Sequence, residues 1–214
     1  MARIGLLGGT FNPPHIGHLV CAQEAYDQLR LDRVALVPAF RPPHKEVPDD
    51  PGPWTRLRLC ELAVEGDERL TVEPLELGRP GPSFTVDTLR ELRGRRPGDE
   101  LTLVVGGDMA ASLTTWREPA EILRLATLAV AGREGLSHAD IAARLAPLHD
   151  GSRVAFFDMP RLDVSSTMLR ARAAGGRSLR YLVPDAVADE IGRRGLYRGR
   201  RPQETPPTEE QHRE

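Results

Sequence analysis

Short apolar runs alternate with longer segments of helical periodicity over most of the chain. Val, Leu and Ala fill the short runs almost continuously, which is typical of strands covered on both faces. In the first long segment, Leu19, Tyr26 and Leu29 recur at helical spacing. The pattern predicts strands at Arg3–Leu7, Arg33–Pro38, Leu70–Glu73, Leu101–Gly106, Thr127–Ala131 and Arg153–Phe157. It predicts helices at Ile16–Arg30, Trp54–Glu65, Ser83–Arg95, Ala120–Leu125 and Ser137–Leu148.

This alternation predicts an α/β fold with a doubly wound, mostly parallel sheet and helices on both faces. In such sheets, ligands bind at the carboxyl ends of the strands. Residues 1–198 are expected to form a single α/β domain, in which 164–198 make a small C-terminal helical appendage. There, Pro184 and Gly195 stand where a helix begins and ends. Residues 199–214 are charged and proline-rich, so we expect a disordered tail.

The composition is that of an ordinary globular protein: 214 residues, 40% hydrophobic and 28% charged. A net charge of -2 argues against a general polyanion-binding surface, so no nucleic-acid partner is expected. No apolar run approaches the roughly 18 residues of a membrane-spanning helix, so no membrane partner is expected. Cys21 and Cys60 lie in helix-like patterns and are expected to be buried thiols. The start of the chain lacks a signal-peptide layout, so we expect a cytoplasmic protein.

The first candidate for chemistry is "GGTFNPPHIGHL", residues 8–19, directly after the first predicted strand. We expect Gly8 and Gly9 to let the backbone turn sharply and to bring amide groups close to a ligand. His15 and His18 are three residues apart at the start of a helix, so they lie on one helix face. A helix N-terminus with two imidazoles favours an anion, above all phosphate.

Two alternatives stand beside phosphate binding. The histidines are incidental if the stretch is only a glycine-rich turn. They are zinc ligands if His44 supplies a third nitrogen, although no cysteine or acidic cluster completes that set. The stretch is neither a Walker A loop nor a G-x-G-x-x-G motif, so histidines stand where a lysine would supply the charge.

A second phosphate cradle is predicted at "VSSTMLR", residues 164–170. Ser165 and Ser166 are candidate N-caps, and Arg170 lies one turn further on. Free amides, hydroxyls and a guanidinium together suit a phosphate. The alternative is an ordinary capped helix with a solvated arginine.

Other stretches are ambiguous when they are taken alone. Asp108, in "GGDMAASLTTW", is a candidate acceptor for ribose hydroxyls or a simple helix cap. Trp116 in the same stretch would be unremarkable as a core residue. His44 and Lys45 follow two prolines and would be solvated surface residues.

Together these stretches resemble a known family. "GGTFNPPHIGH" is similar to the nucleotidyltransferase signature G-x-F-[DN]-P-x-H-x-G-H, and within that superfamily to bacterial nicotinate-nucleotide adenylyltransferases. "PAFRPPHK", "SFTVDTLREL", "GGDMAASLTTW" and "VSSTMLR" agree with the same family in the same order. The resemblance covers nearly everything from Arg3 to Tyr197.

The resemblance implies a Rossmann-like fold and an enzyme that transfers AMP from ATP to nicotinate mononucleotide. The products are nicotinate adenine dinucleotide and pyrophosphate, and Mg²⁺ accompanies ATP as the cofactor. Residues 1–198 then form a single nucleotidyltransferase domain. The catalytic residues are His15, His18 and Arg170. The ATP-binding residues are Gly8, Gly9, Thr10, Phe11, His15, His18, Gly106, Asp108, Ser165, Ser166 and Arg170.

The same resemblance assigns the mononucleotide site. Trp116 stacks on the pyridine ring, Lys45 and His44 face the phosphate, and Thr85 meets the nicotinate carboxylate at a helix start. Arg133 is a further candidate for this substrate. The alternatives are a pantetheine-phosphate adenylyltransferase, an enzyme for the amide mononucleotide, and a nucleotide-binding regulator without chemistry. Whether the chain forms a homo-oligomer stays open.

Overall fold

The structure, a computed structural model, describes residues 1–43, 49–132, 138–148 and 153–198. Within these residues six strands form one sheet in the order β3-β2-β1-β4-β5-β6. Every neighbouring pair is parallel, so the predicted doubly wound sheet is confirmed. The strands are β1 (Arg3–Gly9), β2 (Arg33–Pro38), β3 (Leu70–Val72), β4 (Glu100–Gly106), β5 (Thr127–Ala131) and β6 (Val154–Phe157).

All the predicted helices that lie within the described residues are present, with ends shifted by a few residues. The periodicity does not predict η1, α4 or η2, because none of these spans more than five residues. The helices are α1 (Ile16–Gln28), α2 (Pro53–Val64), η1 (Leu75–Gly78), α3 (Thr85–Arg95), α4 (Gly107–Ala111), η2 (Leu113–Thr115), α5 (Pro119–Leu125), α6 (His138–Leu145), η3 (Ala146–Leu148), α7 (Ser166–Ala174) and α8 (Asp185–Arg194).

Two apolar clusters hold helices to the sheet. Leu89, Ile122 and Ile141, from α3, α5 and α6, belong to the first cluster. Cys21 of α1 and Cys60 of α2 belong to the second. Both cysteines are free and buried, as predicted. Removing so much apolar surface from water is the main stabilising contribution to a fold of this kind.

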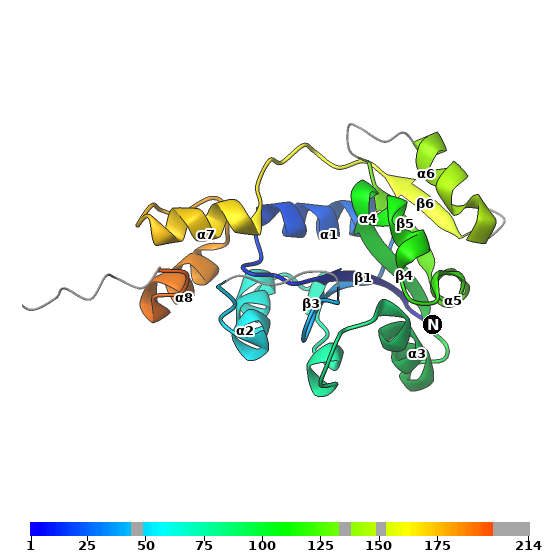
Figure 1. Ribbon diagram of the computed structural model, residues 1–214, viewed down its shortest axis with the longest axis horizontal. Coiled ribbons are helices and arrows are strands. Elements are labelled where there is room, and N and C mark those ends of the chain that lie inside the picture. The colour runs from blue at the N-terminus through cyan, green and yellow to red at the C-terminus, as the bar shows by residue number, and fades with distance from the viewer. Residues whose placement is uncertain (44–48, 133–137, 149–152, 199–214) are drawn as a thin grey trace, which may run out of the picture.

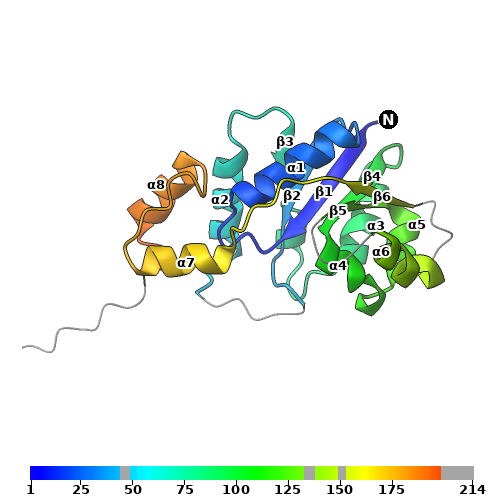
Figure 2. The ribbon, with the colours of Figure 1, turned by 90° about the horizontal axis from the view of Figure 1, so that it is seen from above.

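The sheet order locates the place where a ligand can bind. From β1 the chain builds outward through β2 and β3, and then returns to build β4, β5 and β6 on the other side (Figure 2). The connection after β1 leads to β2 on one side of it, and the connection after β4 leads to β5 on the other side. The loops that follow β1 and β4 therefore leave in different directions. A crevice opens between such loops at the carboxyl edge of the sheet.

The segment after β6 runs back along the molecule beside α1 and leads into α7 (Figures 1 and 2). The Gln28 side chain at the end of α1 holds this segment: it accepts from the Asp158 amide at 2.9 Å and donates to the Asp158 carbonyl at 2.8 Å. This return brings the start of α7 to the loop that follows β1, although the two are more than 150 residues apart in sequence.

The last two helices form a third apolar cluster with α2. Leu169 of α7, Val187 of α8 and Leu59 of α2 are fully buried in it. As predicted, α8 begins directly after Pro184 and ends at Gly195, whose φ of 63° suits a helix C-terminus. The helical appendage is therefore packed on the α/β part through α2. The predicted tail, 199–214, lies outside the described residues.

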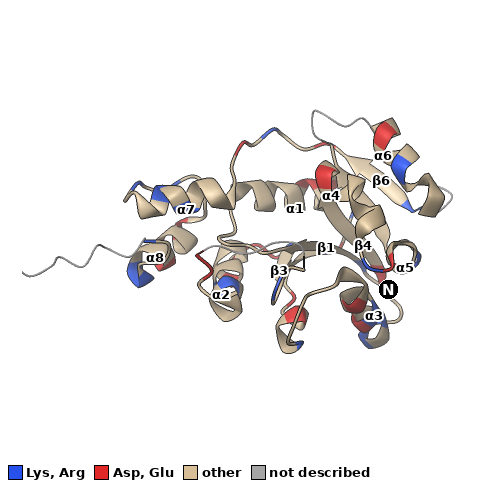
Figure 3. Ribbon diagram, viewed as in Figure 1, with Lys and Arg blue, Asp and Glu red and all other residues tan. Residues whose placement is uncertain are grey.

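Charged residues of both signs occur along the same helices of the described chain (Figure 3). Among the described residues, no helix is long and apolar enough to cross a membrane.

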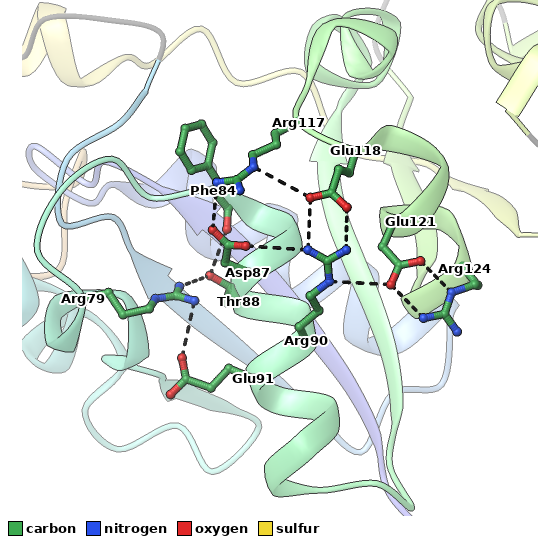
Figure 4. Close-up of polar contacts among 10 residues, drawn as sticks. All are labelled: Arg79, Phe84, Asp87, Thr88, Arg90, Glu91, Arg117, Glu118, Glu121 and Arg124. Atoms are coloured by element: carbon green, nitrogen blue, oxygen red, sulfur yellow. Dashed lines mark hydrogen bonds and ion pairs between the residues drawn. The ribbon is translucent and has the colours of Figure 1, made fainter.

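Ion pairs link α3 with α5 and with Glu118, which directly precedes α5 (Figure 4). Arg90 of α3 lies between Glu118 and Glu121, and Glu121 also pairs with Arg124. These contacts are exposed, so each adds little to stability, but as a network they hold the start of α5 against α3. That contact also places the residues just before α5, which include Trp116 and Arg117.

Glu76 in η1 is a buried carboxylate, with 7% of the residue exposed. Its Oε1 accepts from the Thr88 hydroxyl of α3 at 2.7 Å, and Thr88 in turn accepts from the Arg79 guanidinium. Burial raises the pKa of Glu76 above its ordinary value of 4.5, although hydrogen bonds from Thr88 and Ser83 and the charge of Arg79 act in the opposite direction. The folded protein therefore binds this proton more tightly than the unfolded chain does.

A raised pKa in the folded state makes stability fall as pH rises from about 4.5 through the raised value. Glu76→Gln is neutral at every pH and keeps an acceptor for Thr88. We therefore expect its free energy of unfolding, relative to that of the wild type, to increase as the pH rises. Denaturant unfolding at pH 4.5 and pH 7.5 measures the difference. Glu68→Gln, at an exposed site, controls for the change in net charge. The expectation is contradicted if the free energy of unfolding of Glu76→Gln, relative to that of the wild type, decreases as the pH rises.

Candidate active site

A cavity of about 540 Å³ lies at the carboxyl edge of the sheet. Its walls come from the ends of β1 and β4, the first turns of α1, α3 and α7, and the segment between η2 and α5. Such a volume is within the range of small-molecule sites. Of the predicted site residues, those that line it are Gly8, Gly9, Thr10, His15, His18, Thr85, Gly106, Trp116, Ser165 and Ser166.

The predicted sharp turn at Gly8 and Gly9 is wrong. Both glycines belong to β1, and the chain turns afterwards, where Phe11 takes a φ of 51°. Gly9 is needed for another reason: a Cβ on it would come within 2.9 Å of the Phe11 ring. Gly8 has nothing within 4 Å of its Cβ position, so its open side faces the cavity that it lines. Phe11 itself is 2% exposed and supports the loop from behind.

His15 and His18 form one unit at the start of α1. His15 is the N-cap residue, and its amide donates to Nδ1 of His18 at 3.2 Å. The two rings lie with centroids 3.8 Å apart, and the Phe11 ring meets His18 edge-on at 5.0 Å. Gly17 leaves room for this arrangement, because a Cβ there would lie 3.1 Å from the His15 ring.

The hydrogen bond at Nδ1 sets the tautomer of His18. A nitrogen that accepts from an amide carries no proton, so the ring carries its proton on Nε2. His18 lines the cavity, and in this tautomer its Nε2–H group is available to donate a hydrogen bond there. The geometry thus gives a direction to one of the two imidazoles that the sequence places at the site.

The start of α7 is docked on the loop that follows β1. Ser165 is the N-cap, and its Oγ accepts from the Met168 amide at 3.2 Å. Ser166 Oγ donates to the Pro13 carbonyl at 2.8 Å, and Arg170 Nη1 donates to the Asn12 carbonyl at 2.9 Å. The two predicted phosphate cradles are therefore joined by hydrogen bonds. Arg170 lies one turn behind the two serines, and it is half-buried and does not line the cavity.

The other half of the cavity has aromatic walls. Trp116 is held by a hydrogen bond from its Nε1 to the Ser112 hydroxyl at 3.3 Å. Phe84 and Thr85 stand at the start of α3, and the Arg117 guanidinium lies 4.9 Å from the centre of the Phe84 ring (Figure 4). Amide groups at the first turn of α3 suit an anionic group. This half therefore fits a flat ring that carries a negative substituent.

Some predicted site residues stand apart from this arrangement. Asp108 is exposed in the first turn of α4 and does not line the cavity, whereas Gly106, the N-cap of that helix, does. His44, Lys45 and Arg133 lie outside the described residues. Among the residues that are described, no three His, Cys, Asp or Glu side chains are grouped so that they could hold a metal ion.

Among the lining residues that sequence reasoning did not assign to the site are Glu76, Met109 and Arg117. Met109 and Arg117 lie within or beside the "GGDMAASLTTW" stretch, so their proximity to Asp108 and Trp116 was a usable signal. Glu76 sits in "PLEL", which carries no motif, and only the fold brings it to the cavity.

The chain is similar to proteins that are already known. The cytidylyltransferase-like family matches residues 6–172. A Thermus thermophilus protein named nicotinate-nucleotide adenylyltransferase is 45% identical over 196 residues, which cover 92% of this chain and all of the relative. A Geobacillus thermodenitrificans protein of the same name is 38% identical, with 94% of this chain and 88% of the relative covered.

Solved structures agree in fold. The Plasmodium falciparum nicotinic acid mononucleotide adenylyltransferase complexed with NaAD superposes with a TM-score of 0.76 over 92% of this chain and 98% of that one. At 14% identity the likeness shows the fold alone. The match to the family over most of the chain, together with the identity to the bacterial relatives, shows more. The chain is a nucleotidyltransferase that belongs to the cytidylyltransferase-like family and, within it, to the nicotinate-nucleotide adenylyltransferases.

Proposed function

We propose that this chain transfers AMP from ATP to nicotinate mononucleotide, releasing pyrophosphate and nicotinate adenine dinucleotide. One observation carries the proposal. The loop that bears His15 and His18 and the N-terminus of α7 are hydrogen bonded to each other at one half of a cavity whose other half is aromatic. The first half suits a triphosphate, and the second half suits a pyridine ring.

The substrate supplies its own nucleophile. A phosphate monoester is ionised near pH 7, so one of its oxygens attacks the α-phosphorus of ATP in line, and the bond from that phosphorus to the pyrophosphate oxygen breaks. Neither a general base nor a covalent enzyme intermediate is needed. The protein then acts by positioning both substrates and by stabilising charge.

We assign His18 to the α-phosphate. Its Nδ1 is held by the His15 amide and its ring by Phe11, so the orientation of Nε2–H is set before the substrate binds. A preorganised donor of this kind stabilises the negative charge that develops on the phosphate oxygens as the bond breaks.

We assign the β- and γ-phosphates to His15, Arg170 and the N-terminus of α7. The amides of that first turn and the Ser165 hydroxyl supply directed donors, whereas the Ser166 hydroxyl donates to the Pro13 carbonyl and holds the turn in place. Arg170 lies behind them and adds a fixed positive charge, which stabilises the negative charge that develops on the leaving pyrophosphate.

Mg²⁺ fits this site as a companion of ATP. Glu76 is the one acidic side chain among the described residues that line the cavity, and Thr88 and Ser83 already hold it by hydrogen bonds. The donors around the phosphates are amides, hydroxyls and imidazoles, so we place the ion on phosphate oxygens, where it keeps several waters. When bound, it neutralises part of the phosphate charge.

The mononucleotide occupies the aromatic half. Trp116 stacks on its pyridine ring, and Thr85 with the first amides of α3 faces the carboxylate. His44, Lys45 and Arg133 stay candidates for its phosphate and carboxylate on the strength of the family resemblance. A helix N-terminus favours a carboxylate over a neutral amide, so this half should prefer nicotinate to nicotinamide mononucleotide.

The first test is pyrophosphate release by the purified full chain with ATP, Mg²⁺ and either mononucleotide. We expect release with nicotinate mononucleotide and a kcat/KM about tenfold or more lower with nicotinamide mononucleotide, because the α3 N-terminus then loses its charged partner. No release with either substrate would falsify the proposal. Equal rates would remove the assigned role of the α3 N-terminus and leave the adenylyl transfer standing.

A second prediction concerns His18. His18→Ala removes the donor assigned to the α-phosphate, so kcat should fall about 10²-fold or more at saturating substrates. His138→Ala is the matched control, because His138, in α6, stacks on Phe156 of β6 and does not line the cavity. Turnover of His18→Ala within threefold of the control would remove His18 from the mechanism.

A third prediction concerns Trp116. Trp116→Ala should raise the KM for nicotinate mononucleotide about tenfold and change the KM for ATP little, because the lost stacking area faces the mononucleotide. Trp54→Ala is the control, since Trp54 is 64% exposed and lies outside the cavity lining. A larger effect on ATP than on the mononucleotide would show that the two substrates have been assigned to the wrong halves.

A further inference from the structure

Arg56 of α2 is a fully buried arginine that makes no contact with the cavity. Its guanidinium donates four hydrogen bonds. Nη1 bonds the carbonyls of Thr10 at 2.9 Å and Ala39 at 2.7 Å, Nη2 bonds the carbonyl of Phe40 at 2.9 Å, and Nε bonds Asp50 Oδ1 at 2.9 Å. The planar fork of arginine is suited to holding several acceptors in one geometry.

The carbonyl acceptors belong to two neighbouring loops that contribute to the cavity wall. Thr10 belongs to the loop after β1, which carries the histidines, whereas Ala39 and Phe40 belong to the loop after β2. Thr10 and Ala39 themselves line the cavity. One side chain thus binds the backbone of two substrate-facing loops and, through Asp50, the segment where the chain returns to α2.

The connection extends to α3. The Phe40 amide donates to Ser83 Oγ at 2.9 Å, and the Ser83 amide donates to the Arg41 carbonyl at 2.8 Å. Ser83 lies two residues before Thr85, at the start of the helix that faces the aromatic half of the cavity. A continuous set of hydrogen bonds therefore leads from the loop after β1, through Arg56 and Phe40, to the start of α3.

Stability alone does not account for a charge at this position. Burying a guanidinium removes it from water, and a well-packed apolar side chain of similar volume is often as stable or more so. What an apolar side chain cannot do is hold backbone carbonyls from two loops at a set separation. The four acceptors belong to loops at the carboxyl edge of the sheet.

We propose that Arg56 is a positioning residue that sets the separation between the ATP-binding and the mononucleotide-binding halves of the cavity. It touches neither substrate and acts through the Thr10, Ala39 and Phe40 carbonyls. In-line attack needs the two substrates aligned within a fraction of an ångström, and a small misplacement lowers the rate strongly. This inference rests on the proposed function, because it presupposes two substrates bound in the two halves of the cavity.

Arg93 provides a matched control. It also uses its guanidinium to bond backbone carbonyls, those of Leu125 and Asp99, but it does so at the opposite edge of the sheet, where β4 and β5 begin. Arg93→Lys loses hydrogen bonds of the same kind as Arg56→Lys does. Only Arg56→Lys disturbs the two loops at the cavity.

The test measures binding of three ligands separately by calorimetry: ATP, nicotinate mononucleotide and nicotinate adenine dinucleotide. The dinucleotide has its two ends linked by a pyrophosphate, so its affinity depends on the separation of the two halves. For Arg56→Lys we expect the Kd of the dinucleotide to rise about tenfold or more, the other two Kd values to rise less than threefold, and kcat per folded molecule to fall about tenfold or more. For Arg93→Lys we expect all three Kd values and kcat within threefold of the wild type.

Equal changes in all three Kd values for Arg56→Lys would overturn the inference, because a loss of folded protein affects every ligand alike. If Arg56→Lys does not fold, Asp50→Asn decides, since it weakens the hold on the guanidinium and leaves the carbonyl contacts in place. We then expect the Kd of the dinucleotide to rise about threefold or more, while the Kd values of ATP and of nicotinate mononucleotide stay unchanged. Equal changes, or no change, in all three Kd values overturn the inference. A wild-type chain that binds no dinucleotide and releases no pyrophosphate refutes the proposed function instead.

Discussion

The central position of β1 in the sheet is the constraint on which the rest of the structure depends. It pairs with β2 on one side and with β4 on the other, so the sheet extends from β1 in two lateral directions. A parallel sheet places all strand ends with the same polarity at one edge, and the reversal of strand order opens a crevice there. The two glycines end β1, and the loop that leads to the histidines follows it directly. Its place at the centre of the crevice is a consequence of topology rather than of any single contact.

After β6 the chain returns to the loop that follows β1 and adds the N-terminus of α7 to the cavity wall. Gln28 binds the backbone of Asp158, and the chain reaches the loop after β1 again at Ser166. The hydrogen bond from Ser166 to Pro13 and that from Arg170 to Asn12 then join two helix N-termini around one space. The N-terminus of each helix carries a partial positive charge. Two such termini at one cavity suit a polyanion without a cluster of lysines.

The predictable parts of this site are those that local backbone chemistry determines. Alternating apolar runs placed every strand to within two residues, since burial on both faces demands continuous Val, Leu and Ala. Ser165 as an N-cap also follows from local rules, because its side chain bonds an amide three residues away. The Gly8–Gly9 turn failed as a prediction for a related reason. Glycine permits a turn but does not require one, and here the missing Cβ of Gly9 accommodates the Phe11 ring.

The sequence by itself determined the α/β class, the strands, the approximate helix bounds and, through five ordered stretches, the family and many of the residues that line the cavity. The tertiary structure alone decided how these parts meet. It assigned the tautomer of His18 through the His15 amide, brought Glu76 to the cavity wall, and buried Arg56 between two loops. Such features depend on contacts between residues that are far apart in sequence. No local pattern encodes them, because an arginine in an amphipathic helix has the same spacing whether it faces water or holds two loops together.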